Sequence, residues 1–190
     1  MEMSQSAYRY VASLLLLAAA FLLLSSFSNN WPQIDTALNY LYVREIKPNR
    51  SPEIDMFNRS VGNPLGASYC GAFVGYDLTA SGAIEPEVRS GLARNYYRHG
   101  FEAYSAGSVI RGINKVEKGD IIIWARGNAV YGHTGFAFQD WDGPSGKTIE
   151  ANTSPPGGSQ WNGDGVYIKE REIHPYSFFR IIGFSKVRFS

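Results

Sequence analysis

The sequence changes from one hydrophobic period to another near its middle, and this change limits the fold more than any other feature. In the first half, apolar residues recur at helical spacing, with Pro and capping residues where helices would start. From Gly119 onward, short apolar runs are separated by Gly, Pro, Asn or Asp, which is typical of strands joined by turns. Helices followed by a run of strands indicate the α+β class, with a helical N-terminal half packed on a mostly antiparallel sheet of about five strands.

The expected elements follow from these patterns. Asp35 is expected to cap a helix that runs through Ile46, with Leu38, Leu41 and Tyr42 on one face. Ser51 and Pro52 are a cap followed by Pro at the first helical position. Two further helices are expected over 70–78 and 86–98. The five strands are expected within residues 119–124, 132–141, 147–152, 165–172 and 181–189.

Residues 1–30 differ from the rest of the chain. No charged residue occurs from Tyr10 to Ile34, and Val11–Leu24 is apolar apart from Ser13, with Arg9 before it. A basic start, an apolar core and small residues after it are the layout of a secretory signal peptide. An uncleaved hydrophobic helix that anchors the chain in a membrane is the alternative. We therefore expect export, to the periplasm or the extracellular space, or anchoring at the inner membrane, with one domain over 31–190.

Composition excludes some functions. The formal net charge is +1 and no run of Lys or Arg occurs, so the chain has no basic surface signal for a nucleic acid partner. The apolar fraction of 44% is that of a chain able to build a core. A single Cys excludes an internal disulfide.

That single Cys lies in the stretch "NPLGASYCGAFVGYDL", where a turn is predicted to become a helix. One interpretation is packing, since free Cys behaves as a small apolar residue. The other is that Cys70 is a nucleophile, because unpaired N–H groups and the helix dipole at a helix start favour a thiolate. A nucleophilic Cys needs a general base, and His is the usual one.

Of the three His residues, His133 best fits a general base. His99 lies at a predicted helix end, and His174 precedes a proline in a strand-to-turn junction. His133 enters a strand whose alternate residues Gly135 and Ala137 are small, which leaves room for a substrate. A buried structural His is the alternative.

The following strand supplies a partner for His133. In "TIEANT", Glu150 and Asn152 are two residues apart, so strand alternation predicts that both project from one face. Either could hold the second ring nitrogen of His133 and fix its tautomer. A solvated Glu–Asn pair is the alternative.

Four motifs in this order produce a family resemblance. They are "GASYCGAFV", "GDIIIW", "GHTG" and "IEAN", and together they resemble the CHAP peptidoglycan hydrolases of the papain-like group, which includes the NlpC/P60 peptidases. The resemblance extends from about Asp35 to the carboxyl end. It implies a papain-like fold, peptidoglycan as the partner and hydrolysis of an amide bond in a stem peptide or cross-bridge.

The resemblance also assigns roles. It implies that Cys70 is the nucleophile and His133 the general base, with Glu150 and Asn152 completing the catalytic site. Tyr69 stands where such enzymes commonly have Trp. We expect Tyr69, Tyr131 and Trp161 to line the substrate groove.

No cofactor or metal is expected, since no cluster of Asp residues has the spacing of a calcium loop. Asp77 and Asp120 are expected to be capping or turn residues. Two other functions remain open at the level of sequence. One is a cysteine amidase that acts on another amide, including an antibacterial toxin. The other is a membrane-anchored envelope-binding module that keeps the fold without chemistry.

Overall fold

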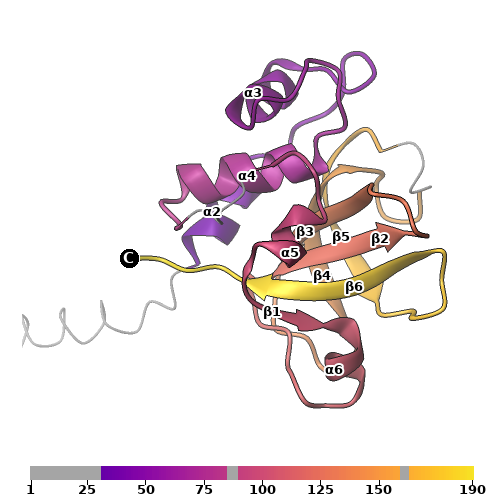
Figure 1. The fold of residues 1–190 in the computed structure, drawn as a ribbon. Helices are drawn as coiled ribbons and strands as arrows, with labels where there is room; N and C mark the ends of the chain where they lie inside the picture. The colour runs from indigo at the N-terminus through magenta and orange to yellow at the C-terminus, as the bar shows by residue number, and fades with distance from the viewer. Residues whose placement is uncertain (1–30, 85–89, 159–162) are drawn as a thin grey trace, which may run out of the picture. The chain divides into compact units, whose positions relative to one another are not determined.

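A computed structural model describes residues 31–84, 90–158 and 163–190, and it confirms the α+β class (Figure 1). Trp31–Ser190 form one compact unit. The hydrophobic helix expected within residues 1–30 lies outside the described residues. In the part of the chain that is described, no helix is both long enough and apolar enough to cross a membrane.

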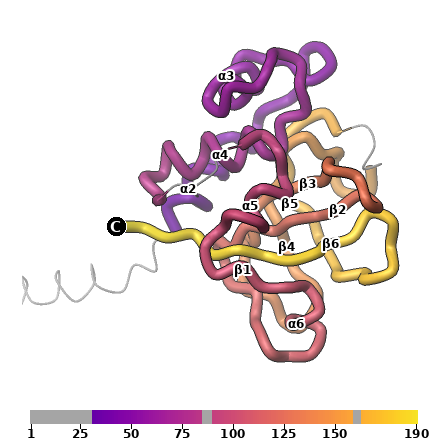
Figure 2. The backbone as a smooth tube through the Cα atoms, in the orientation of Figure 1, coloured from indigo at the N-terminus to yellow at the C-terminus, as the bar shows by residue number. Residues whose placement is uncertain are grey.

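The sheet has six strands, and every neighbouring pair is antiparallel. Their spatial order is β1-β6-β2-β3-β4-β5, so β6, near the end of the chain, lies between β1 and β2 (Figure 2). The strands are β1 (Phe101–Ser105), β2 (Ile121–Arg126), β3 (Gly132–Ala137), β4 (Ser145–Thr153), β5 (Gly165–Glu172) and β6 (Phe179–Lys186). The last five match the five expected strands.

Strand β1 is the one that sequence patterns missed. It pairs with β6 at an edge of the sheet, and its register shifts between Phe101 and Tyr104. Glu102 there has a φ of 43°, which is unusual for a residue with a side chain. This irregularity breaks the alternation of buried and exposed residues by which strands are recognised in sequence.

Five described helices are short. They are α2 (Pro32–Leu38), α3 (Pro52–Ser60), α4 (Cys70–Ala80), α5 (Asn95–Arg98) and α6 (Ala106–Ile110). Helix α3 begins as expected, because the Ser51 hydroxyl accepts a hydrogen bond from Ile54 N–H and Pro52 follows it.

The expected helix from Asp35 to Ile46 is wrong at both ends. Helix α2 begins at Pro32, so Asp35 lies in its first turn instead of capping it. It ends at Leu38, because the chain then turns to pair with β5, where Val166 N–H donates to Val43 O at 3.2 Å. Tyr42, expected on one helix face with Leu38 and Leu41, lies after the end of α2 and is 66% exposed. Pairing with a distant strand outweighed local helix propensity.

Only the last turn of the expected helix over 86–98 is present as α5, and Pro86 lies outside the described residues. The chain around Gly91 instead runs against the start of α4. A Cβ on Gly71 would approach the Gly91 carbonyl oxygen to 2.2 Å, so these backbones meet closely. Tyr96 fixes the contact by donating its hydroxyl to Gly71 O at 2.9 Å.

The core lies on both faces of the sheet. Against one face, Phe73 of α4 makes aromatic contacts with two rings. Its ring centroid is 5.3 Å from that of Phe57 in α3 and 6.4 Å from that of Phe136 in β3. The other face has its own cluster, in which Trp141 packs edge-on against Phe184. Because α4 is held against β3, its first residue is fixed at the strand that carries His133.

Candidate active site

Cys70 is the first residue of helix α4 and is 6% exposed. The preceding residue, Tyr69, makes no side-chain cap, so the first-turn N–H groups are not occupied by a side chain. Backbone N–H groups of Gly71 and Thr134 act on the thiol. A sulfur at this point lies where a helix start stabilises negative charge.

His133, the second residue of β3, faces that thiol. It is opposite Trp124 of β2, and the two ring centroids are 5.2 Å apart. The His133 Nε2 atom is 2.8 Å from Oε2 of Glu150. Since Nε2 is engaged by the carboxylate, Nδ1 is the ring atom left for Cys70, with which His133 shares a hydrogen bond.

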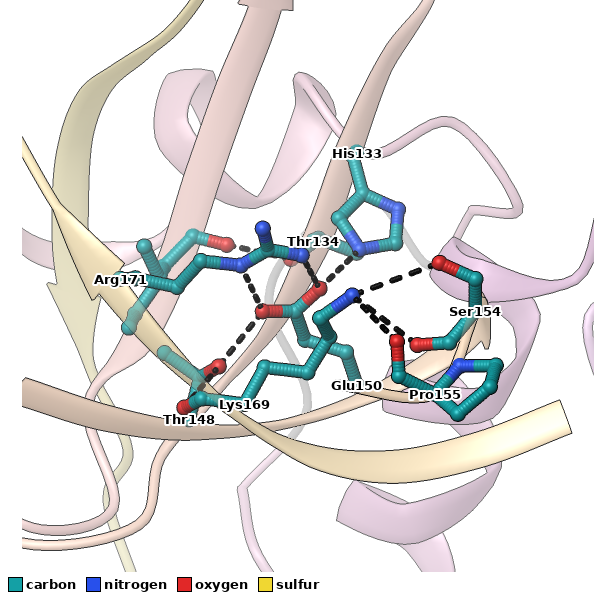
Figure 3. Close-up of polar contacts among 9 residues, drawn as sticks. His133, Thr134, Thr148, Glu150, Ser154, Pro155, Lys169 and Arg171 are labelled. Carbon is teal, nitrogen blue, oxygen red and sulfur yellow. Dashed lines mark hydrogen bonds and ion pairs between the residues drawn. The ribbon is translucent and has the colours of Figure 1, made fainter. Parts of the chain in front are cut away.

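Glu150 is fully buried and is held from three sides (Figure 3). Arg171 of β5 donates to both carboxylate oxygens at 2.6 Å, and the Thr148 hydroxyl donates to Oε1 at 2.5 Å. The third contact is His133. A bidentate guanidinium and a hydroxyl fix the plane of the carboxylate, so Glu150 in turn fixes the imidazole ring.

Gly135 makes this arrangement possible. A Cβ at that position would lie 2.8 Å from Cγ of Glu150 and 2.5 Å from the Ile149 carbonyl oxygen. The second glycine of the "GHTG" motif therefore leaves the space through which Glu150 reaches His133.

The pKa values of the three groups favour charge separation. Burial alone would raise the pKa of Cys70, but hydrogen bonding to His133 and its charge lower it overall. Burial would lower the pKa of His133, yet its hydrogen bonds to Cys70 and Glu150 raise it to about 9. Burial opposes ionisation of Glu150 too, but Arg171 and then His133 hold its pKa well below the ordinary range. The directions indicate a thiolate–imidazolium pair beside a permanent carboxylate.

Cys70 and His133 open into a cavity of about 870 Å³, a volume suited to a peptide-sized ligand. Asn152 also lines it. However, Asn152 has a φ of 55°, and the pairing of β4 with β5 shifts there. Strand alternation therefore does not extend to Asn152, and Glu150 is the residue that hydrogen-bonds His133.

Of the three expected groove residues, one lies in the cavity wall. Tyr131 lines the cavity and is 67% exposed. Tyr69 is wrong as a groove residue, because its side chain turns inward and is fully buried in the core. Trp161 lies outside the described residues.

Sequence reasoning missed Arg171 and Thr148. Thr148 had a usable signal, because it stands two residues before Glu150 and so shares its face of the strand. Arg171 had none, since it is opposite Gly146 in the register of β4 and β5, four residues from the partner of Glu150. Only the register and the reach of the side chain bring it to the carboxylate.

The described residues contain no group of three His, Cys, Asp or Glu side chains that could hold a metal ion. Asp120 is a turn residue as expected, accepting from Glu117 N–H at 2.9 Å. Asp77 differs from expectation. It lies inside α4, fully buried, and burial raises its pKa.

No known protein family, curated protein or solved structure matches this chain.

Proposed function

We propose that this chain is a cysteine peptidoglycan hydrolase that cleaves an amide bond of the stem peptide or cross-bridge. The observation that carries the proposal is the alignment of Cys70, His133 and Glu150, with the first two exposed to one cavity. A nucleophile, a base and a residue that orients the base are the parts that acyl transfer needs. The resemblance of the motifs to CHAP enzymes supports a papain-like arrangement and names the substrate.

The proposed reaction begins from the thiolate–imidazolium pair. The Cys70 thiolate attacks the amide carbonyl carbon, and N–H groups at the start of α4 stabilise the oxyanion. The His133 imidazolium gives its proton to the leaving nitrogen as the C–N bond breaks, which leaves a thioester on Cys70. The neutral imidazole then takes a proton from water, whose oxygen displaces the thiolate and releases the acid.

The other site residues have supporting roles in this proposal. Glu150 holds the imidazole with Nδ1 toward the sulfur and stabilises the imidazolium. Asn152 lines the cavity, where its amide is available to the oxyanion or to the substrate. The proposal needs no cofactor. The predicted N-terminal signal or anchor would place the enzyme outside the cytoplasm, where peptidoglycan lies.

The direct test is digestion of purified peptidoglycan by the protein and by Cys70→Ala, with mass analysis of the released fragments. The wild type is expected to release fragments with new amino groups, which identify the bond. Cys70→Ala is expected to lose at least about 10³-fold of the rate, because no acyl-enzyme can form. An unchanged thermal unfolding midpoint would show that the variant is folded.

Lysis by Cys70→Ala at the wild-type rate would end the nucleophile assignment. Wild-type protein that binds the wall without releasing any fragment would instead favour the envelope-binding module. Cleavage of another amide with no action on the wall would identify a different amidase.

A further inference from the structure

Asn152 lines the cavity with Cys70 and His133, although its backbone leaves the regular strand at this point. Its φ is 55°, and the pairing of β4 with β5 shifts at this residue. A left-handed conformation is uncommon for a residue with a side chain, and it persists where surrounding contacts impose it. The contacts on either side of Asn152 therefore decide where its amide lies in the cavity.

The backbone of Asn152 is enclosed from two sides. Its N–H faces the hydroxyl of the buried Tyr69. Gly163 lies against its carbonyl group, since a Cβ on that glycine would come within 2.4 Å of the Asn152 carbonyl carbon and oxygen. The next carbonyl oxygen, that of Thr153, accepts from Asp164 N–H at 3.0 Å. These contacts fix the peptide groups before and after Asn152.

A buried ammonium holds the turn that follows Asn152 (Figure 3). The ammonium belongs to Lys169 of β5, which is 6% exposed. Its Nζ donates to the Ser154 carbonyl oxygen at 2.9 Å, to the Ser154 hydroxyl oxygen at 3.4 Å and to the Pro155 carbonyl oxygen at 3.3 Å. An ammonium has three N–H donors, so the turn uses all of them. Lys169 therefore ties this turn to the face of β5.

The same face of β5 carries the cation that holds Glu150. Lys169 and Arg171 are two residues apart on this strand, so alternation places both on one face. Arg171 donates to both carboxylate oxygens of Glu150. Lys169 donates to the turn after Asn152. Strand β5 thus acts on two of the expected site residues, on Glu150 directly and on Asn152 through the turn.

Stability alone does not explain a buried ammonium here. Its three acceptors are neutral oxygens, and burying a charge is costly. Burial and then the charge of Arg171 lower the pKa of Lys169, while the charge of Glu150 opposes them. An apolar side chain of similar size often gives equal or greater stability at a buried charged position. What the ammonium adds is a fixed position for the turn.

We propose that Lys169 is a positioning residue for the Cys70 reaction and acts through Asn152, by holding the turn that keeps the Asn152 amide in the cavity. The inference rests on the proposed function, and there it gives Asn152 a contact with the amide that Cys70 attacks. Lys169 does not line this cavity, so it touches no substrate bound there. Loosening the turn frees Asn152 to leave its left-handed conformation, which withdraws its amide from the substrate.

The test is a double-mutant cycle on the rate of peptidoglycan digestion, with the full chain as the enzyme. Asn152→Ala is expected to lose about tenfold of the rate, and Lys169→Met about fivefold. Because Lys169 acts through Asn152, the double variant should lose about tenfold, no more than Asn152→Ala alone. A loss of about 50-fold in the double variant, the product of the two, would overturn the inference. Full activity of either single variant would overturn it too.

Lys147→Met is the matched control. Lys147 is exposed on β4, and its replacement changes the net charge by the same amount. The control should leave the digestion rate unchanged, with or without the Asn152 side chain. An equal loss in Lys147→Met and Lys169→Met would overturn the inference, because the effect would then come from general charge.

A second variant covers the case in which thermal unfolding shows that Lys169→Met does not fold. Lys169→Arg then takes its place in the cycle. Arginine keeps the charge but moves the donors, so a loss of about threefold is expected, again only when the Asn152 side chain is present. A loss that persists in Asn152→Ala, or no loss at all, would overturn the inference.

The position of the Asn152 amide can also be measured without any substrate. The NMR signal of this side-chain amide is identified by its absence from Asn152→Ala. Lys169→Met should shift the signal, and Lys147→Met should leave it in place. An unmoved signal in Lys169→Met would overturn the inference.

Failure of the inference and failure of the proposed function are distinguishable. Digestion of peptidoglycan with additive losses in the cycle would overturn only the role of Lys169. If the wild type digests no peptidoglycan, the proposed function fails, and the NMR signal decides whether Lys169 positions Asn152.

Discussion

Glu150 is the residue on which the site depends, because it is a buried charge whose ionisation every neighbour supports. It has no exposed surface, and Arg171, Thr148 and His133 occupy its two oxygens. A buried carboxylate is costly unless it is paired and hydrogen-bonded. The guanidinium of Arg171 therefore acts on Cys70 through two intermediates, Glu150 and His133, and is a positioning residue.

Replacing Arg171 with Met tests that chain of contacts. The variant leaves a buried carboxylate without its main partner, and the expected loss is about 3–5 kcal/mol of unfolding free energy. The pKa of Glu150 should rise, and the carboxyl then ceases to hold the imidazolium. Urea unfolding measures the first effect, and the pH profile of peptide cleavage measures the second.

Arg171→Lys is the matched control for charge. Lysine keeps the positive charge but not the planar bidentate contact, so partial recovery of stability and of the pH profile is expected. A loss below about 1 kcal/mol in Arg171→Met, with an unchanged pH profile, would show that Arg171 does not position Glu150.

Among the elements, β3 and β4 set the distance between His133 and Glu150. Gly135 is opposite Glu150 in their register, and a Cβ there has no space. Gly135→Ala should push the strands apart or displace the carboxylate, at a cost of about 1–3 kcal/mol and with a loss of activity larger than the loss of folded protein. Thermal unfolding and the specific activity of the folded fraction measure the two effects.

Gly107→Ala is the comparison for this variant. Gly107 lies in α6, where an added Cβ would come no closer than 3.3 Å to the end of the Arg111 side chain. Alanine also has the higher helix propensity, so this variant should be neutral or slightly stabilised and fully active. Equal behaviour of the two variants would contradict the role given to Gly135.

Local patterns in the sequence placed Cys70 at a helix start, His133 at a strand start and Glu150 inside a strand, and the structure has each of them there, because periodicity is regular at these points. The same patterns gave wrong or missing predictions where the backbone departs from regular strand geometry. Alternation does not place Asn152, whose φ is positive, and it does not reveal the shifted edge strand β1. Neither the inward turn of Tyr69 nor the reach of Arg171 from β5 follows from local sequence, because both are set by tertiary packing.

At the scale of the whole compact unit, the site brings together segments that are far apart in sequence. The reactivity of the Cys70 thiol depends on groups from all of them. Helix α4 supplies the thiol, β3 the imidazole, β4 the carboxylate and β5 the guanidinium. Because Cys70 is the only Cys in the chain, alkylation of the protein reports on this site alone. The central claim is that the fold converts this buried thiol into a thiolate through His133.

The most direct measurement is the rate of Cys70 alkylation by iodoacetamide as a function of pH, in the wild type and in His133→Ala. The pKa of Cys70 is lowered and that of His133 is raised to about 9, so the ion pair should exist between these two values. The wild type should therefore react at pH values below the ordinary thiol pKa of about 8.5. In His133→Ala, burial is opposed only by the backbone N–H groups of Gly71 and Thr134, so the pKa of Cys70 should rise and the reactivity should shift to higher pH. A wild-type profile that rises near pH 8.5 and is unchanged in His133→Ala would contradict the account, since Cys70 would then be a packing residue.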